Sequence, residues 1–182
     1  MSIRVIAGQY GDRTLATPPG NRTHPMSERA RNALFNSLGD EVKGARVLDA
    51  FAGTGALGIE ALSRGAQQAT FVERDRIAQS VIAKNIASLG IDSAHARLQR
   101  APLASWIEHL DASEKFDLIL ADPPYHDVQF STVAKLFGLL KPGALMVLSH
   151  PGRGEVPIRY DIVVVDSRSY SNAYLTFFRR EG

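Results

Sequence analysis

Residues 46–60 read RVLDAFAGTGALGIE, and this segment indicates the fold class. Its first residues form a short apolar run typical of a buried strand, and from Ala56 onward the apolar residues return at helical spacing. The glycine-containing segment between them is typical of the loop that joins a strand to a helix in α/β proteins. We therefore predict a strand over residues 46–50 and a helix over residues 56–64.

The same alternation continues toward the C-terminus. Further apolar runs predict strands over residues 69–73, 96–99, 116–121 and 144–149. The segments between them predict helices over residues 76–89 and 128–140, the latter ended by Lys141-Pro142-Gly143, and a short helix containing Trp106. Such alternation predicts a parallel sheet covered by helices on both faces. Residues 161–166 and 174–178 are β-like runs without a helix between them, so we expect an antiparallel hairpin at one edge. The expected fold is a doubly wound α/β domain with a mostly parallel, seven-stranded sheet.

The residues before this domain have a different character. Residues 1–25 read as an extended arm with a turn at Gly11-Asp12, and Ser27 is predicted to cap a helix that runs to about Leu38. Residues 1–32 contain five arginines and two acidic residues, a charge of +3, whereas the whole chain carries +2. A basic arm on a nearly neutral body is typical of a segment that contacts nucleic-acid phosphates. We therefore divide the chain into a basic arm and helix, residues 1–40, and an α/β domain, residues 41–182.

Composition excludes several other classes of protein. The chain has 182 residues, of which 45% are hydrophobic, and it has no cysteine, which excludes a disulfide scaffold, a thiolate metal site and a cysteine nucleophile. No apolar run approaches the roughly 20 residues that span a bilayer, and the N-terminus does not resemble a signal peptide. The five histidines lack the spacing of a metal site. We expect a cytoplasmic protein that uses no metal and has no membrane partner.

The glycine loop predicts a nucleotide-like ligand. Gly53 to Gly58 fits G-x-G-x-x-G, and Glu73 follows at the spacing of the acid that binds ribose hydroxyls in dinucleotide enzymes. Asp49, however, ends the strand just before the loop, where a carboxylate would repel a pyrophosphate. S-adenosylmethionine carries an ammonium, a sulfonium and a ribose diol but no phosphate. Asp49 can attract its cationic end, Gly53 and Gly55 allow close approach of the backbone, and Glu73 can bind the ribose, so this ligand fits better.

A second motif follows the strand predicted over residues 116–121. It reads Asp122-Pro123-Pro124-Tyr125, and its two prolines make a stiff turn whose carbonyls point in fixed directions. Asp122 and the Pro123 carbonyl can accept the two hydrogens of a nucleobase amino group and turn its lone pair toward an electrophile. Tyr125 can stack on a base that has left the helix. The motif therefore predicts transfer of a group to an exocyclic amino nitrogen.

Together these residues resemble a known family. The pattern Asp-x-Phe-x-Gly-x-Gly, Glu73 and the Asp-Pro-Pro-Tyr turn are similar to class I, Rossmann-like methyltransferases that act on amino groups of nucleic-acid bases. The N-terminal residues and the segment Ala61-Leu62-Ser63-Arg64-Gly65-Ala66 narrow the resemblance to the RsmD family, which methylates N2 of one guanine in 16S ribosomal RNA. The N-terminal residues that carry it are Ile6-Ala7-Gly8, Pro25, Ser27-Glu28-Arg29, Arg31 and Ala33-Leu34-Phe35-Asn36.

The resemblance implies roles for particular residues. It implies S-adenosylmethionine as cofactor and S-adenosylhomocysteine as product, bound by Asp49, Phe51, Gly53, Thr54, Gly55, Glu73, Arg74, Arg100 and Ala101. The catalytic residues are then Asp122, Pro123, Pro124 and Tyr125. The partner is 16S ribosomal RNA or the assembling small subunit, met by a monomer. RNA contacts are expected from Arg4, Arg13, Arg22, His24, Arg29, Arg31, Tyr170 and Asn172.

Two of those positions depart from the family pattern. His24-Pro25-Met26 stands where the family has Arg-Pro-Thr, and Tyr170-Ser171-Asn172 replaces a Tyr-Gly-Asp-like turn. Three alternatives stay open at this point. The first is the same chemistry on adenine N6 or cytosine N4 of other RNA or DNA. The second is a dinucleotide-dependent oxidoreductase using the glycine loop. The third is a catalytically silent RNA-binding factor for ribosome assembly.

Overall fold

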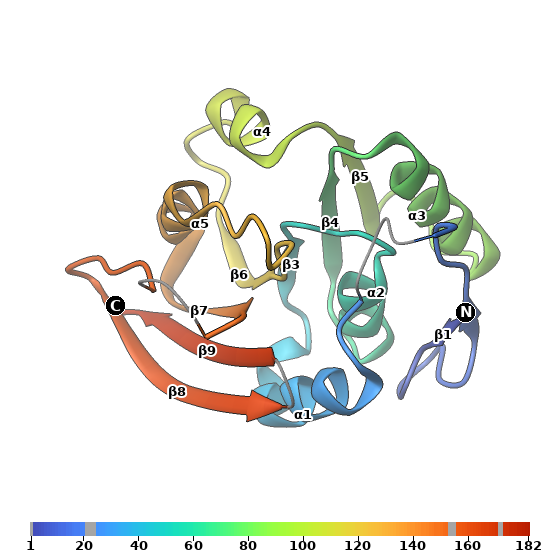
Figure 1. Cartoon of the computed structure of the whole chain (residues 1–182), viewed down its shortest axis with the longest axis horizontal. Coiled ribbons are helices and arrows are strands. Elements are labelled where there is room, and N and C mark those ends of the chain that lie inside the picture. Colours follow the sequence, from blue (N-terminus) through green and yellow to red (C-terminus); the bar gives the residue numbers. More distant parts are fainter. Residues whose placement is uncertain (1, 21–24, 153–155, 171–172) are drawn as a thin grey trace.

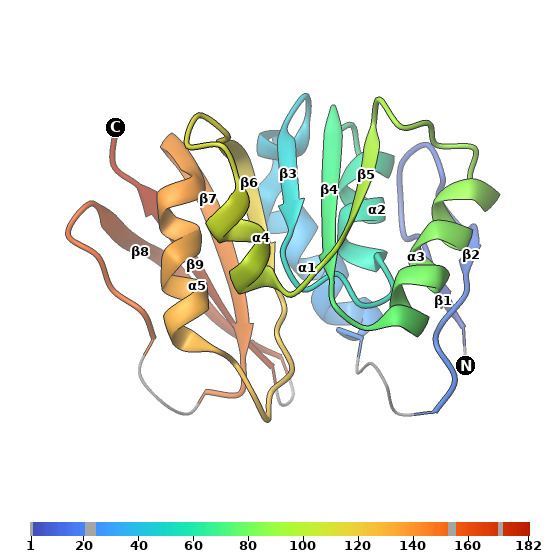
Figure 2. The same ribbon diagram turned by 90° about the horizontal axis from the view of Figure 1, so that it is seen from above.

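The computed structural model describes residues 2–20, 25–152, 156–170 and 173–182. Its main sheet has seven strands in the order β5-β4-β3-β6-β7-β9-β8 (Figures 1 and 2). The main strands are β3 (Arg46–Asp49), β4 (Gln68–Glu73), β5 (Ala96–Arg100), β6 (Phe116–Ala121), β7 (Leu140–His150), β8 (Ile162–Tyr170) and β9 (Ala173–Arg180). The helices are α1 (Glu28–Leu38), η1 (Gly39–Val42), α2 (Ala56–Ser63), α3 (Arg76–Ser88), α4 (Leu103–His109), α5 (Phe130–Leu136) and η2 (Phe137–Leu139). Strands β3 to β7 are parallel, and β9 pairs antiparallel with both β7 and β8. The predicted fold is confirmed.

Strand alternation gives the sheet two buried faces. Side chains at alternating positions of β3 and β6 enter two different clusters, one with Val47, Leu118 and Leu120 and the other with Leu48, Ile119 and Ala121. The first cluster is covered by α1, α2 and α3, and the second by α4 and α5. Because both faces are buried, the central strands are mostly apolar, as is typical of parallel sheets. Their carboxyl ends therefore remain as the place for polar function.

Helix α2 packs very closely against β4. A Cβ atom on Gly58 would lie only 2.3 Å from Cε1 of Phe71, so only glycine fits at this helix position. The close approach fixes α2, and with it the loop that precedes the helix, against the sheet. The third glycine of the loop pattern thus serves helix packing.

The N-terminal arm is part of the same core. Its two short strands, β1 (Ile3–Arg4) and β2 (Thr14–Leu15), pair antiparallel with each other, with the turn near Gly11-Asp12 as predicted. Val5 and Leu15 are fully buried in the cluster that also holds the apolar face of α1. Residue 40 therefore does not divide the core into two parts.

A buried carboxylate fastens the arm to α2. Glu60 is 0% exposed, and its oxygens accept hydrogen bonds from the backbone amides of Ile6 (2.8 Å) and Ala7 (3.1 Å). The guanidinium groups of Arg31 (3.1 Å) and Arg64 (2.8 Å) complete its partners. The arm therefore has a specific, hydrogen-bonded seat.

The predicted helix boundaries hold with one exception. Ser27 caps α1 as expected, since its Oγ accepts from the amide of Ala30 at 3.1 Å. The helix predicted over residues 128–140 is wrong at its C-terminal end, because Leu140 already begins β7 opposite Phe116. Lys141-Pro142-Gly143 therefore lies inside that strand rather than stopping a helix, next to a break in register between Phe116 and Leu118. Full burial of Leu140 against the sheet outweighs the turn-forming tendency of these residues. None of the helices in the described ranges is long and apolar enough to cross a membrane.

Candidate active site

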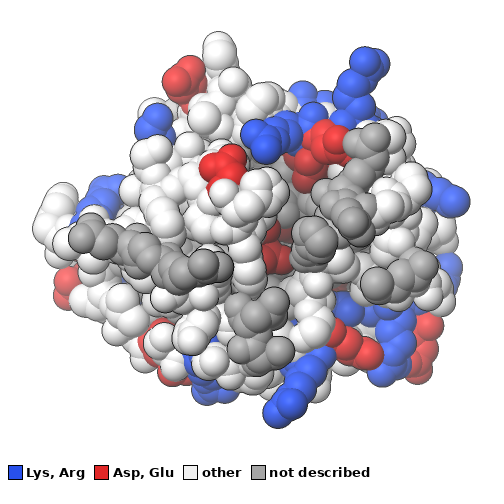
Figure 3. Space-filling model, viewed as in Figure 1, with Lys and Arg blue, Asp and Glu red and all other residues white. Residues whose placement is uncertain are grey.

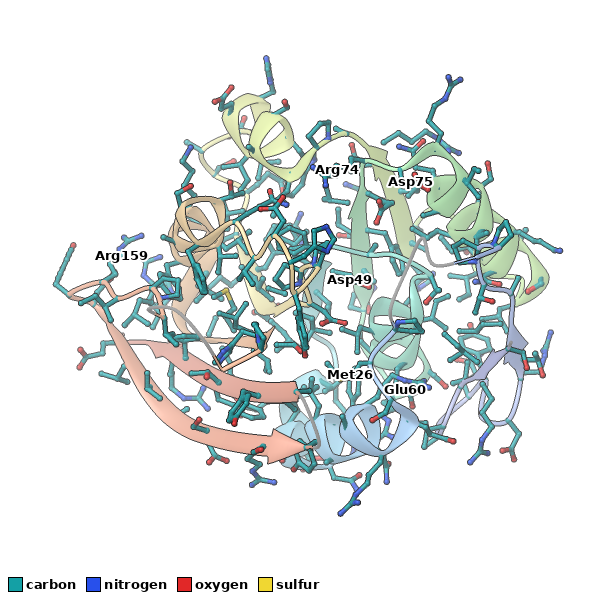
Figure 4. All side chains as sticks on the ribbon, viewed as in Figure 1. Met26, Asp49, Glu60, Arg74, Asp75 and Arg159 are labelled. Atoms are coloured by element: carbon teal, nitrogen blue, oxygen red, sulfur yellow. The ribbon has the colours of Figure 1, made fainter. Side chains whose placement is uncertain are left out.

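Acidic side chains meet at the carboxyl edge of the sheet. Asp49 ends β3, Glu73 ends the neighbouring β4, and Asp122 directly follows β6 on the other side of β3. The face seen in Figure 3 is hollowed at its centre, and acidic atoms lie within the hollow. Figure 4 places Asp49 toward the middle of the same view. The sheet topology therefore brings together the acids that the sequence singled out.

Asp49 is buried but incompletely paired. It is 1% exposed, its Oδ2 accepts from the amide of Gly58 at 3.0 Å, and its Oδ1 has no hydrogen-bond partner among the described residues. Burial raises the pKa of this carboxyl well above its ordinary value, and the charges of Asp122 and Glu73 raise the pKa further, against a smaller lowering by the Gly58 amide. A buried acceptor without a donor is costly, so this oxygen suits a cationic or hydrogen-bonding ligand.

Backbone and side-chain hydrogen bonds together hold the glycine loop in place. Gly55 has φ 83°, a conformation that favours glycine, and its amide donates to Ala52 O at 2.7 Å. The Thr54 hydroxyl accepts from the amide of Ala56 at 3.2 Å, and Asn85 of α3 donates to Thr54 O at 3.1 Å. Asn85 also bonds both the amide and the carbonyl of Ala16, so one buried amide side chain links the loop to the arm.

Glu73 supports the loop from the next strand. Its Oε1 accepts from the amide of Gly53 at 2.8 Å, and its Oε2 accepts from the amide of Asp75 at 2.8 Å. An ionised carboxylate has about four acceptor positions, so two remain for a ligand. Of the other residues expected at the cofactor, Arg74 and Arg100 are exposed, and Phe51 is partly buried at the rim of the core. Ala101 donates its amide to Glu73 O at 3.1 Å, which joins the ends of β4 and β5.

The Asp-Pro-Pro-Tyr turn faces Asp49 across the edge of the sheet. Burial raises the pKa of Asp122 to about 7, against a smaller lowering by a hydrogen bond with the Ser149 side chain. The phenol of Tyr125 lies 2.6 Å from Ser149 Oγ. Burial raises the pKa of Tyr125 as well, the charge of Asp122 adds to that rise, and the bond with Ser149 opposes it. Pro123 is buried and Pro124 is exposed.

Ser149 is a site residue that the sequence did not reveal. It precedes the last residue of β7, whose Leu148 pairs with Ala121 of β6, so Ser149 comes next to Asp122. The only available signal was its place at the carboxyl end of a predicted strand adjacent to the motif-bearing one.

The arginines of the arm and α1 fall into two groups. Arg4, Arg13 and Arg29 are exposed, although Arg4 pairs with Asp12 and with Glu28 at 2.6 Å, and Arg13 donates to Ser88 O at 2.9 Å. Arg31 is different. It is 2% exposed, its Nη1 donates to Arg4 O and Glu60 Oε1, and burial lowers its pKa. The prediction that Arg31 contacts RNA is therefore wrong, because its guanidinium is enclosed in the core.

Of the remaining expected RNA contacts, Tyr170 lies at the carboxyl edge of the sheet, and the others lie outside the described residues. Tyr170 ends β8, where it pairs with Ala173, and its side chain packs against the core cluster that contains α1. Arg22, His24 and Asn172 lie outside the described residues. In the part of the chain that the structure describes, no three His, Cys, Asp or Glu side chains are placed to hold a metal ion.

Comparison with known proteins places the chain in a family. Residues 3–179 match the sequence model of the family described as "Conserved hypothetical protein 95". The chain belongs to this family. A Bacillus subtilis relative of the family, named "Putative rRNA methyltransferase YlbH", is 31% identical over 186 residues, which cover 99% of this chain and 100% of that protein. "Ribosomal RNA small subunit methyltransferase D" of Haemophilus influenzae is 32% identical over 150 residues, 79% of this chain and 76% of that protein.

A solved structure agrees with the family assignment. YhhF from Escherichia coli is 30% identical, superimposes with a TM-score of 0.85, and the match covers 100% of this chain and 99% of that one. The likeness thus includes the arm as well as the sheet. The Escherichia coli structure therefore has the same overall architecture as this chain along its whole length.

Proposed function

We propose that this protein transfers a methyl group from S-adenosylmethionine to the exocyclic N2 of a guanine in small-subunit (16S) ribosomal RNA. The observation that carries the proposal is the pair of carboxyls at the ends of adjacent strands, the buried Asp49 and the partly buried Asp122. The Asp122 charge raises the pKa of Asp49, so the two carboxyls act on each other across the site. Such a pair favours a cation beside it. The names of the family relatives support ribosomal RNA as the substrate class.

The cofactor end of the site fits a sulfonium ligand. S-adenosylmethionine supplies a methyl group on a positively charged sulfur, which leaves uncharged in S-adenosylhomocysteine. Asp49 Oδ1, the unpaired buried acceptor, would take the cationic methionine end, and the open acceptor positions of Glu73 would take the ribose hydroxyls. The backbone at Gly53 and Gly55 permits close approach. Phe51, Thr54, Arg74, Arg100 and Ala101 would complete the surroundings of the cofactor.

The Asp-Pro-Pro-Tyr turn fits the acceptor base. Asp122 and the Pro123 carbonyl would accept the hydrogens of the amino group, Pro124 stiffens the turn, and Tyr125 would stack on the base. With the cofactor bound, the amino nitrogen would form its bond to the methyl carbon as the carbon–sulfur bond breaks, and the electron pair of that bond would stay on sulfur. The methylated nitrogen must lose a proton. Asp122, with a pKa of about 7, is suited to accept it near neutral pH.

The basic arm and helix, residues 1–40, would hold the RNA beside the methyl-transfer domain, residues 41–182. Arg4, Arg13 and Arg29 are exposed there, and Arg22, His24, Tyr170 and Asn172 complete the proposed contact set. Phosphate contacts of this kind position RNA without reading its sequence. We expect a monomer that acts in the cytoplasm on the ribosomal RNA or the assembling subunit.

The test is methyl incorporation from labelled S-adenosylmethionine into small subunits that lack their base methylations. We expect N2-methylguanosine at one site after digestion to nucleosides. N6-methyladenosine or N4-methylcytidine would keep the chemistry and overturn the proposed base, and absence of incorporation would overturn the enzyme itself.

Asp122→Ala tests the assigned role of the turn. Because the variant loses the acceptor for the amino group, we expect methyl transfer to fall at least about a thousandfold while S-adenosylmethionine affinity stays within about twofold. Asp127→Ala, at an exposed aspartate in the loop that follows, is the matched control and keeps full activity. Near-normal turnover by Asp122→Ala would remove Asp122 from the mechanism.

A further inference from the structure

Ser149 occupies a position between two residues of the Asp-Pro-Pro-Tyr turn. It is 2% exposed, and it lies on β7, the strand that pairs in parallel with β6. Its Oγ lies 2.6 Å from the phenol oxygen of Tyr125. Ser149 follows Leu148, which pairs with Ala121, so Ser149 also lies beside Asp122, and its side chain lowers the pKa of that carboxyl. One hydroxyl on a neighbouring strand thus bonds the last residue of the turn and lies beside the first.

The chemistry of the three groups fixes the direction of these bonds. An ionised carboxylate can only accept, whereas a serine hydroxyl has one hydrogen to donate and lone pairs to accept. Toward an ionised Asp122 the hydroxyl of Ser149 can therefore act only as donor, which leaves the phenol of Tyr125 to donate to Ser149. The hydrogen bonds run in one direction, from Tyr125 through Ser149 to Asp122, as long as Asp122 is ionised.

We propose that Ser149 is a positioning residue that fixes the ring of Tyr125 and the carboxylate of Asp122 relative to each other, so that the stacking surface and the amino-group acceptor form one preorganised unit. This inference rests on the proposed function of the turn. Without Ser149 the ring can rotate away from the base, and the carboxylate loses a donor that holds it in place. Preorganisation of this kind lowers the barrier by removing the cost of orienting groups during the reaction.

Ser149 also affects the pKa of Asp122, and with it the pH range in which Asp122 is ionised. The Ser149 bond lowers the pKa of Asp122 against the larger effect of burial, so loss of the bond raises the pKa further. Among the described residues, the Asp122 charge acts on two other ionisable groups, Asp49 at the end of β3 and Tyr125 in the turn. His150 follows Ser149 but is engaged elsewhere. Its Nδ1 accepts from the amide of Gly152 at 3.2 Å, so its Nε2 carries the hydrogen and donates to Thr176 at 2.8 Å.

The experiment compares Ser149→Ala, Tyr125→Phe and the double variant over a range of pH. We expect Ser149→Ala to move the acidic limb of the kcat profile upward by about one pH unit, because a donor to the charged form of Asp122 is lost. Tyr125→Phe keeps the ring and should move the limb in the same direction by less, with about a threefold to tenfold loss of kcat/KM for RNA. Because Tyr125 acts through Ser149, the double variant should be no worse than the more impaired single variant.

Independent readouts keep the inference separate from the proposed function. The Asp122 carboxyl can be titrated by NMR in protein carrying 13C-labelled aspartate, and we expect a higher pKa in Ser149→Ala than in the parent protein whether or not methyl transfer is found. Ser167→Ala, at an exposed serine on β8, is the matched control and leaves both readouts unchanged. If Ser149→Ala does not fold, Tyr125→Phe alone still decides the question. An unshifted Asp122 titration in the folded variants, or fully multiplicative losses in the double variant, overturns the inference.

Discussion

Two buried carboxylates within one strand–loop–helix unit have opposite surroundings. Glu60 of α2 is 0% exposed, and its oxygens accept from two backbone amides of the arm and from two guanidinium groups. Asp49 of β3 is 1% exposed, yet it accepts from one amide, and its other oxygen has no partner in the part of the chain that the structure describes. The first site is complete within the protein, whereas the second is not.

The difference separates structure from function. A buried charge that is fully paired can be retained because its partners offset the cost of removing it from water. A buried carboxyl without a full set of partners destabilises the charged form, which is why the pKa of Asp49 is raised. The buried Asp49 lies close to a second carboxyl, Asp122, and both effects destabilise the charged form of Asp49. A ligand that donates to Asp49 or carries a positive charge would offset this loss of stability. We therefore interpret Glu60 as an anchor and Asp49 as a binding group.

Removal of the anchor Glu60 should have the largest effect on stability. Glu60→Ala leaves Arg31 buried without its carboxylate and frees the amides of Ile6 and Ala7, so we expect the free energy of unfolding to fall by about 3–5 kcal/mol. Equilibrium urea unfolding measures it. Glu60→Gln keeps the size of the side chain and one acceptor oxygen, so its free energy of unfolding should lie between those of the parent protein and Glu60→Ala. A loss below about 1 kcal/mol in Glu60→Ala would show that the arm does not depend on this seat.

The next change sharpens the other half of the comparison. Asp49→Asn removes the negative charge that we propose binds the cationic end of S-adenosylmethionine. We therefore expect the affinity for this cofactor, measured by calorimetry, to fall about tenfold to a hundredfold. The same variant should have an unchanged or larger free energy of unfolding in the absence of ligand, because it removes a buried carboxyl whose Oδ1 has no partner among the described residues. Weaker folding together with unchanged cofactor affinity would reverse the assignment of roles.

The pH dependence of Asp49→Asn has a definite sign. Asp49 has a higher pKa in the folded protein than in the unfolded chain, so the folded state holds the proton more tightly. Its contribution to stability is then largest below the unfolded pKa and is lost as pH rises toward the folded pKa. Asp122 follows the same rule between its ordinary value of 3.8 and about 7. The free energy of unfolding of Asp49→Asn should therefore fall less steeply with rising pH than that of the parent protein. Its affinity for the cofactor should also rise less with pH.

The smallest expected effect compares two arginines of α1. Arg29 is exposed, whereas Arg31 is enclosed with Glu60. Arg29→Gln should leave the free energy of unfolding within about 0.5 kcal/mol. It should lower the slope of log affinity for RNA against log salt by about one. Arg31→Gln should instead destabilise the fold, and filter binding over a salt series together with unfolding curves separates the two. An unchanged salt slope in Arg29→Gln would remove that residue from the RNA interface.

Local sequence was sufficient for the elements and for two of the motifs. Residues 46–60 and the Asp-Pro-Pro-Tyr turn are continuous segments, and their meeting follows from strand order in a parallel sheet. Arg31 was misassigned although a signal existed, since it falls on the same helical stripe as the buried Leu34, Phe35 and Leu38. The position of Arg31 on the buried stripe of α1 prevails over the usual exposure of arginine, because Glu60 pairs its guanidinium in the core.

Other features depend on contacts that no local pattern contains. Ser149 matters only because β7 pairs beside β6, and Asn85 only because α3 passes both the glycine loop and Ala16. Leu140 joins β7 because it is buried opposite Phe116, which overrides the turn residues that follow it. These are tertiary effects, and a single sequence without the fold does not show them.

The seat of the arm also constrains the order in which the protein can form. Residues 3–16 leave the ribosome before α2 and α3, yet the amide of Ile6 bonds a side chain 54 positions later and that of Ala16 one 69 positions later. A two-stranded ribbon as short as β1–β2 is marginal by itself in water. The arm must therefore wait, with Val5 and Leu15 exposed to solvent, until Glu60 and Asn85 have been synthesised and placed. Its docking therefore depends on long-range contacts, and it closes the core beside the glycine loop.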